Sequence, residues 1–252
     1  MTLTTSRSPI VKGLLAAALT MAVTATAGSA MAAAGDDDWK GAGGLTLNSV
    51  DNAKVDAYLD RARQAEKAIS TDVRAAAQIS GAELIGFDQR LKSADSLKRK
   101  VATSLKDNPR QDVDSVLGRL TDAVRYTLQW PDDHYTTGVT QASTVLAAWG
   151  NDSTKWANTW NRTSGYKGLN TGWRATRSGQ LYEIQFHTPA SKHAQEATHL
   201  LYEEQRLPST SPERKKELQA QQDALFRAVP VPDGADRLTA PEHTTVPVPV
   251  VF

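Results

Sequence analysis

The sequence predicts an α+β domain in which a mixed β-sheet is flanked by helices. Three observations lead to this prediction. Apolar residues recur at helical spacing over 49–70, which indicates an amphipathic helix. Residues 181–188 alternate between apolar and polar side chains, as in a β-strand with two different faces. Strand-like segments are interspersed with helix start and stop signals, and a tight turn at 177–180 joins two of them into a hairpin.

Each expected helix has a local reason. The first covers about 49–70, and a second helical piece leads to Ser80-Gly81. Ser93 can cap a helix over about 94–105, which Asn108-Pro109 ends because proline cannot continue a helix. The remaining helices start beside Asp, or at a proline that suits a first helical turn. They are expected at about 112–117, 134–149, 189–206 and 212–228.

The expected strands separate these helices. One starts at Leu84 and carries on to Arg90 or Lys92, and a β-prone run over 123–130 is stopped by Pro131. Others lie near 156–160, 172–176 and 181–187. In the last strand, alternation places Tyr182, Ile184 and Phe186 toward the core and Glu183, Gln185 and His187 on the opposite face.

The N-terminus predicts export. Arg7 and Lys12 precede an uncharged apolar stretch, 13–27, that is too short to span a membrane, and Ala30-Met31-Ala32 fits a signal-peptidase site. We therefore expect a secreted, extracellular protein without membrane attachment after cleavage. The expected divisions are a signal peptide at 1–32, a flexible leader at 33–48, a catalytic domain at 49–228 and a proline-rich extended tail at 229–252.

Charge and cysteine content exclude several functions. The chain has 29 basic and 28 acidic side chains, so no overall field recruits nucleic acid or a membrane. It has no cysteine, which excludes disulfides, thiolate chemistry and cysteine-ligated metals. Function must therefore come from the local arrangement of a few side chains.

A basic segment is the first candidate site. Arg90 and Lys92 point the same way if their segment is extended, and a helix that starts at Ser93 places Ser96 and Lys100 on one face. Cations that converge on a helix start suit a polyphosphate. The alternative is a basic helix face in contact with solvent.

Three further features could carry chemistry. The loop 164–170 has glycines that let the backbone approach a ligand, and an exposed Tyr166 there could stack on a base. Alternatively, the loop is a plain turn with a buried tyrosine. Asp122, near a strand start, could hold a metal or cap a turn. The polar face of Glu183, Gln185 and His187 could belong to a site or simply meet solvent.

In this order, the pieces resemble the synthetase domain of RelA/SpoT-type alarmone (ppGpp) synthetases. That family shows an Arg-x-Lys-x-x-x-Ser element, an Asp strand, a Gly-Tyr loop, a Glu-x-Gln strand and a helix with His-x-x-Tyr. The match covers about 84–206, and its joint order is more specific than any single motif. The chain also looks similar to the secreted nucleotide 3′-pyrophosphokinases. The matching residues are Arg90, Lys92, Ser96, Asp122, Gly165, Tyr166, Glu183, Gln185, His199 and Tyr202.

The resemblance implies a nucleotidyltransferase-like domain and a specific reaction. The β,γ-pyrophosphate of ATP would pass to the 3′-hydroxyl of a purine nucleotide, with Mg²⁺ as cofactor. Asp122 and Glu183 would be catalytic and bind the metal, and Glu183 would also take the hydroxyl proton. The ATP phosphates would be held by Arg90, Lys92, Ser96 and Lys100. The acceptor would be bound by Tyr166, Lys167, Asn170, Gln185 and His187, with support from Arg125, His199 and Tyr202.

The chain departs from the family pattern on the acceptor side. The family loop commonly ends in Ser-x-His, where this chain has Gly168-Leu169-Asn170, and His187 stands at a position where the family has arginine. The spacing from Asp122 to Arg125 is also shorter than usual. The His-Asp dipeptide of the family's hydrolase half is absent. We therefore expect adenine nucleotides to be accepted at least as well as guanine nucleotides; the oligomeric state stays open.

Two other classes of function compete with this interpretation. A metal-dependent hydrolase could use His187, His193 and His199, although their spacing makes a poor ligand set on a helix. A secreted, non-enzymatic binding module could use exposed tryptophans as a platform, although large aromatic side chains are more often part of a core. The tryptophans in question are Trp130, Trp149, Trp156, Trp160 and Trp173.

Overall fold

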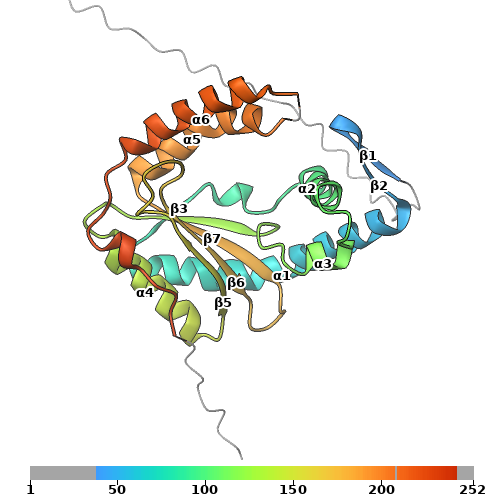
Figure 1. Cartoon of the computed structure of the whole chain (residues 1–252). Helices are drawn as coiled ribbons and strands as arrows, with labels where there is room; N and C mark the ends of the chain where they lie inside the picture. The colour runs from blue at the N-terminus through green and yellow to red at the C-terminus, as the bar shows by residue number, and fades with distance from the viewer. Residues whose placement is uncertain (1–37, 208, 243–252) are drawn as a thin grey trace, which may run out of the picture. The chain divides into compact units, whose positions relative to one another are not determined.

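The computed structural model describes residues 38–207 and 209–242 (Figure 1). The expected signal peptide at 1–32 lies outside the described residues. Within the described part, a five-stranded sheet has the strand order β3-β4-β7-β6-β5. β4 and β7 are parallel and the other neighbours are antiparallel, so the sheet is mixed. Its strands are β3 (Glu83–Ile85), β4 (Arg125–Gln129), β5 (Asp152–Asn158), β6 (Leu169–Arg174) and β7 (Leu181–His187).

Helices cover both faces of this sheet, which confirms the predicted fold class (Figure 1). α1 (Ser49–Ser80) and α4 (Tyr135–Ala148) lie on one side, and α5 (Pro189–Gln205) and α6 (Pro212–Arg227) lie on the other. The remaining α-helices are α2 (Ala94–Asp107) and α3 (Val113–Leu117). Among the described residues, no helix is both long enough and apolar enough to cross a membrane.

α1 is one continuous helix of 32 residues, where two helical pieces were expected. The Asn48 side chain accepts the Asp51 backbone N–H at its start, which satisfies one of the free donors of the first turn. The helix ends at Gly81, whose φ of 69° lies in the left-handed region that glycine adopts without strain. It is continuous because its buried stripe runs on past residue 70 through Val73, Ala76 and Ala77.

The core forms between α1, α4 and one face of the sheet. Tyr182, Ile184 and Phe186 of β7 are each 0% exposed, as the alternation predicts. The Tyr126 hydroxyl in β4 lies 2.9 Å from the hydroxyl of Ser70 in α1. The Tyr135 hydroxyl in α4 donates to the Phe186 carbonyl at 3.1 Å. This packing leaves the opposite face of β4 and β7 to form the polar site.

The local start signals of α2, α3, α5 and α6 are confirmed, whereas α4 begins after His134 without a side-chain cap from a preceding Asp. Ser93 accepts the Ser96 N–H at the start of α2, and Asp112 caps α3 in the same way. Thr188 caps α5, which has Pro189 in its first turn. α6 begins with the predicted Ser211-Pro212 pair. These ends depend on hydrogen bonds within one turn of chain, which is why the local sequence predicts them.

The strand expected from Leu84 to Arg90 or Lys92 is wrong beyond residue 85. Gly86 has a φ of 61°, which turns the chain into a short 3₁₀ helix, η2 (Phe87–Gln89). Arg90 is itself in a helical conformation, and only Leu91 pairs again, in an isolated bridge with Val124. Arg90 and Lys92 are therefore not two neighbours on one face of a continuous strand.

Two terminal segments are also more ordered than expected. Within the predicted flexible leader, β1 (Trp39–Gly41) and β2 (Leu45–Leu47) form a hairpin, with the 3₁₀ turn η1 (Ala42–Gly44) between them. Leu47 is only 2% exposed.

In the predicted extended tail, η3 (Ala235–Arg237) follows a buried Val229. The backbone carbonyls around η3 accept hydrogen bonds from strand β5. Trp156 Nε1 donates to the Leu238 carbonyl at 3.0 Å, and Asn158 Nδ2 donates to the Ala235 carbonyl at 2.8 Å. The described part of this segment therefore packs on the domain.

Candidate active site

Two acidic side chains lie near the point where the parallel strands β4 and β7 begin. Asp122 lies three residues before Arg125, the first residue of β4, and Arg125 is the register partner of Glu183. The Glu183 N–H donates to the Val124 carbonyl at 2.9 Å, which holds the two strand starts together. The structure thus brings the two predicted catalytic acids to one end of the sheet.

Asp122 forms ion pairs with both predicted phosphate-binding lysines. Its Oδ2 lies 2.9 Å from Lys92 Nζ, and its Oδ1 lies 2.7 Å from Lys100 Nζ. The Asp122 side chain is only 12% exposed. Burial favours its neutral form, but Lys100 and Lys92 favour the charged form more strongly, so the pKa of Asp122 lies below its usual range. The result is a compact cluster of one carboxylate and two ammonium groups.

Backbone pairing carries Lys92 to this cluster. The Lys92 N–H donates to the Ala123 carbonyl at 3.0 Å, and the Arg125 N–H donates to the Arg90 carbonyl at 2.8 Å. Lys100 arrives from α2, one turn beyond Ser96. Ser96 is exposed, and its N–H is already bound by the Ser93 hydroxyl at 3.3 Å. Ser96 therefore lies on the predicted helix face, but its amide is occupied by the helix cap.

Glu183 has an environment that raises its proton affinity. Burial raises the pKa of Glu183, and the negative charge of Asp122 raises it further, while Arg125 and a hydrogen bond from Gln185 oppose the shift. Gln185 Nε2 donates to Glu183 Oε1 at 2.8 Å. A carboxylate with a raised pKa is a better proton acceptor than one free in water.

Arg90 is held by an acid that the sequence reasoning missed. Its Nε donates to Glu66 Oε1, and its guanidinium lies 4.2 Å from the centre of the Phe87 ring. Glu66 is 6% exposed, on the buried stripe of α1, and also accepts the Ser70 hydroxyl. The signal that could have revealed it is a charged residue at a position where the helical pattern requires an apolar one.

The predicted acceptor loop supplies a half-buried tyrosine, where an exposed one was expected. The Tyr166 hydroxyl donates to Asn170 Oδ1 at 2.9 Å and lies 3.0 Å from His187 Nε2. The Tyr166 ring packs edge-on against His187 and Phe226, with its centroid 5.6 Å from that of Phe226. The expectation of a freely exposed stacking platform is therefore wrong, and the ring is preorganised by α6.

His187 is a buried residue that contacts the Tyr166 hydroxyl. It is 0% exposed, and burial lowers its pKa to about 3, with smaller effects from Lys192 and Arg125. Both ring nitrogens of His187 are paired, because Nε2 lies 3.0 Å from the Tyr166 hydroxyl and Nδ1 lies 2.8 Å from the Ser191 hydroxyl. In the described structure, His187 is closed to direct contact with a nucleotide.

The other predicted site residues lie on β4, β7, α5 and the loop before β6. Arg125 is exposed beside Glu183, and Lys167 is half-buried next to Tyr166. Gln185 is 7% exposed and hydrogen-bonded at both ends of its amide. His199 is exposed on α5, and Tyr202 is 50% exposed beneath the Arg206 guanidinium. Among the described residues, no hydrogen bond or ion pair joins His199 or Tyr202 to Asp122 or Glu183.

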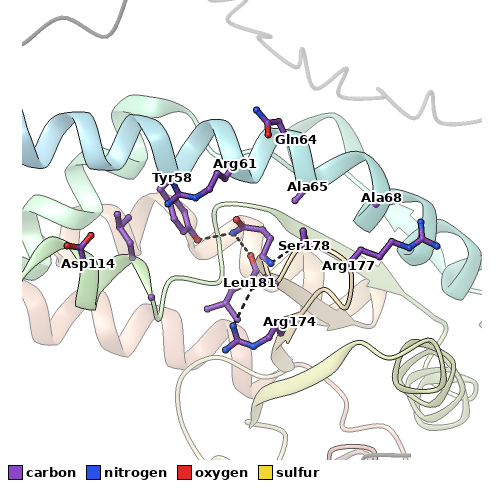
Figure 2. Close-up of a pocket in the computed structure, with 14 residues that line it drawn as sticks. Tyr58, Arg61, Gln64, Ala65, Ala68, Asp114, Arg174, Arg177, Ser178 and Leu181 are labelled. Carbon is purple, nitrogen blue, oxygen red and sulfur yellow. Dashed lines mark hydrogen bonds between the residues drawn. The ribbon is translucent and has the colours of Figure 1, made fainter. Parts of the chain in front are cut away.

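A separate hollow of about 630 Å³ lies between α1, α3 and the turn before β7 (Figure 2). Its rim includes Arg61, Arg174 and Arg177, whose side chains point in different directions in Figure 2. None of the predicted site residues lines it. The hollow is therefore not the candidate active site.

The structure does not favour the two competing classes. Of the five tryptophans in question, Trp130, Trp160 and Trp173 are at most 1% exposed and Trp156 is half-buried, which leaves Trp149, at 40% exposed, too isolated to form a platform with the others. His187 is buried in β7, whereas His193 and His199 are exposed on α5. Across residues 38–207 and 209–242, no group of three or more His, Asp or Glu side chains is arranged to hold a metal ion.

Comparison with known proteins gives structural similarities only. A scan against protein-family models found no match, and a search of curated proteins found none. A chain from the complex between the type VI effector Tas1 and its immunity protein is 19% identical, with a TM-score of 0.47, over 69% of this chain and 95% of that chain. The small alarmone synthetase 1 from Bacillus subtilis, bound to its product pppGpp, is 16% identical, with a TM-score of 0.49, over 69% and 92%.

The protein smu.1046c from Streptococcus mutans UA159 is similar to the same degree. It is 16% identical, with a TM-score of 0.48, over 68% of this chain and 90% of that chain. The chain is thus similar in structure to small alarmone synthetases, and its candidate site is the cluster of Asp122, Glu183, Lys92 and Lys100.

Proposed function

We propose that the protein is a pyrophosphokinase that transfers the β,γ-pyrophosphate of ATP to the 3′-hydroxyl of a purine nucleoside 5′-phosphate. The observation that carries the proposal is the meeting of Asp122 and Glu183 with Lys92 and Lys100 at one end of the sheet. Phosphoryl transfer needs charge neutralisation and positioning more than covalent help from the protein. These four side chains supply both.

The lysines would act as phosphate ligands by exchanging one anion for another. In the free protein both bind Asp122, at 2.9 Å and 2.7 Å. A triphosphate carries more charge than a single carboxylate and can draw both ammonium groups to itself. Arg90 would add a third cation while Glu66 holds its Nε, because a guanidinium has further N–H groups to offer.

Mg²⁺ is the cofactor that the acidic pair would suit. Mg²⁺ prefers oxygen ligands, and the charge of Asp122 already raises the pKa of Glu183, so a cation would relieve the repulsion between the two carboxylates. Asp122 and Glu183 would hold the ion once the lysines turn to the phosphates. When bound, the ion would supply further neutralisation of the phosphate charge.

Glu183 would take the proton of the attacking 3′-hydroxyl. The 3′-oxygen forms a bond to the β-phosphorus of ATP, and the bond between that phosphorus and the oxygen bridging to the α-phosphate breaks. AMP leaves with the bridging oxygen, and the proton passes to Glu183. The raised pKa of Glu183 suits this proton transfer.

The acceptor would lie beside Tyr166, Lys167 and Asn170. Tyr166 offers a ring held in place by Phe226 and His187, and stacking on a ring does not distinguish one purine from another. Asn170 Oδ1 is engaged by the Tyr166 hydroxyl, which leaves its amide N–H groups as donors. We propose that adenine nucleotides are accepted at least as well as guanine nucleotides, so that ATP alone serves as donor and acceptor.

We also propose that the enzyme acts outside the cell, because residues 1–32 have the signal-peptide pattern. Mass spectrometry of culture supernatant should find a mature N-terminus near Ala33. Full-length, cell-associated protein alone would contradict export.

Product analysis tests the proposed activity. Purified protein incubated with ATP and Mg²⁺ should release AMP and form a 3′-pyrophosphorylated nucleotide, separated by anion-exchange chromatography. Inorganic phosphate with ADP would indicate a hydrolase, and unchanged ATP would indicate a binding protein. Either of these results would contradict the proposal.

A further inference from the structure

A chain of three hydrogen bonds leads from α5 to the carboxylate of Glu183. Lys192 Nζ donates to Gln195 Oε1 at 2.9 Å. Gln195 Nε2 donates to Gln185 Oε1 at 3.2 Å, and Gln185 Nε2 donates to Glu183 Oε1 at 2.8 Å. Neither Lys192 nor Gln195 belongs to any of the sequence motifs considered above.

Lys192, where this row of hydrogen bonds begins, determines which group donates and which accepts in each of the three bonds. A lysine ammonium group has donors and no acceptor, so it must face the oxygen of the Gln195 amide. The amide nitrogen of Gln195 then faces Gln185, which must present its own oxygen. The nitrogen of Gln185 is left to face Glu183, so the carboxylate always receives a hydrogen bond and never meets an amide oxygen.

We infer that Lys192 and Gln195 are positioning residues that hold the Gln185 amide in the one orientation that supports Glu183 as proton acceptor. This inference rests on the proposed function. The hydrogen bond from Gln185 fixes Glu183 Oε1, and no other hydrogen bond to this carboxylate is present among the described residues. Glu183 Oε2 therefore stays available to the substrate.

The location of Lys192 and Gln195 on α5 suits residues that position Glu183 better than residues that bind phosphate. Lys192 is 19% exposed on the first turns of α5, where Glu196 also lies 3.5 Å from its ammonium group. Gln185 is 7% exposed and lies on the sheet face beneath α5. The two helix residues act on Glu183 through Gln185, and neither contacts the carboxylate itself.

Four side chains at position 195 separate hydrogen-bond direction from charge. Lysine is an obligate donor and keeps Gln185 in its native orientation, whereas glutamate is an obligate acceptor and turns the amide around. Methionine does neither and carries no charge. If direction matters, the wild-type glutamine and Gln195→Lys have similar kcat, while Gln195→Met is lower and Gln195→Glu is lowest.

A purely electrostatic effect gives a different order. In that case glutamine and methionine, both neutral, have the same kcat and lie between lysine and glutamate. We expect kcat to fall about fivefold in Gln195→Met, since the hydrogen bond that orients Gln185 is lost, and further in Gln195→Glu. The KM for ATP should not change, because Lys92, Lys100 and Arg90 lie on other elements. Equal kcat for wild type and Gln195→Met would overturn the inference.

Two further measurements keep the test decisive. If Gln195→Met does not fold, Lys192→Met should lower kcat without changing the KM for ATP, and Lys192→Arg, which keeps an obligate donor, should restore it. Wild-type kcat in Lys192→Met would overturn the inference.

If the wild-type protein forms no 3′-pyrophosphorylated nucleotide, the proposed function fails, and melting temperature replaces kcat as the readout. The wild type and Gln195→Lys should then melt together, above Gln195→Met. Equal melting temperatures for the wild type and Gln195→Met would overturn the inference by itself.

Discussion

Asp122→Asn should separate the binding of ATP from its turnover. In the free protein the Asp122 carboxylate holds Lys92 and Lys100, and in the proposed complex the lysines turn to the phosphates. The substitution keeps the shape of the side chain and removes the charge that competes for the lysines. We expect tighter binding of ATP in the absence of metal, together with a loss of turnover of at least ~10²-fold.

The size of the binding effect follows from the exposure of the ion pairs. Lys92 is 22% exposed and Lys100 is 47% exposed, so solvent screens both interactions with Asp122. Partly exposed ion pairs contribute about 1 kcal/mol or less each. Two such pairs no longer need to be broken in Asp122→Asn, which corresponds to roughly tenfold tighter ATP binding, since ~1.4 kcal/mol is a factor of ten.

Isothermal titration calorimetry with ATP and EDTA measures this effect without metal. Asp114→Asn is the matched control, because Asp114 pairs with Lys54 at 2.6 Å, is 67% exposed and lies away from the candidate site. The control should bind ATP as the wild type does. Unchanged or weaker ATP binding by Asp122→Asn would refute the exchange of carboxylate for phosphate.

Three further outcomes are expected from single substitutions. Glu183→Gln should lower kcat at least ~10²-fold while the melting temperature stays near that of the wild type; near-normal turnover would remove Glu183 from the mechanism. Tyr166→Ala should raise the acceptor KM about tenfold for adenine and guanine nucleotides alike in initial-rate assays, whereas Tyr166→Phe keeps the ring and should change it little. An effect on one purine only would mean that the loop reads base edges. His187 has a folded pKa of about 3, below the ordinary 6.5, so its contribution to stability is present above pH 6.5 and is lost as the pH falls toward 3. Between pH 7.5 and pH 5, the free energy of unfolding should therefore fall about 2 kcal/mol less in His187→Gln than in the wild type, as measured by denaturant unfolding. The same fall in both proteins would contradict the assigned burial of His187.

Local features made most of the elements predictable. Caps such as Ser93 and Ser211 act within one turn, and alternation in β7 identifies the buried Tyr182, Ile184 and Phe186. The ends at 39–47 and 229–242 were not predictable in this way. Their order comes from contacts with distant residues, such as the hydrogen bond from Trp156 to the Leu238 carbonyl, and Gly- or Pro-rich sequence gives no periodic signal of it.

The sequence pointed to the acids and lysines of the candidate site, but not to the residues that hold the site residues in place through hydrogen bonds. The resemblance assigned Asp122 and Glu183 to one site, and in the structure Glu183 is the register partner of Arg125, three residues after Asp122. Glu66 reaches Arg90 across 24 positions of sequence, and Gln195 meets Gln185 only because α5 folds back over β7. The burial of His187 likewise depends on packing around the strand, which alternation alone does not reveal.

The most direct test of the central claim follows both transferred phosphorus atoms. Wild-type protein and Glu183→Gln are incubated with ATP as both donor and acceptor, and the products are followed by ³¹P NMR. We expect the wild type to release one AMP for each 3′-pyrophosphate formed, with the β- and γ-phosphorus atoms transferred together, and the variant to form neither product at a comparable rate. ADP with free phosphate, or a 3′-monophosphate, would contradict the proposed pyrophosphate transfer.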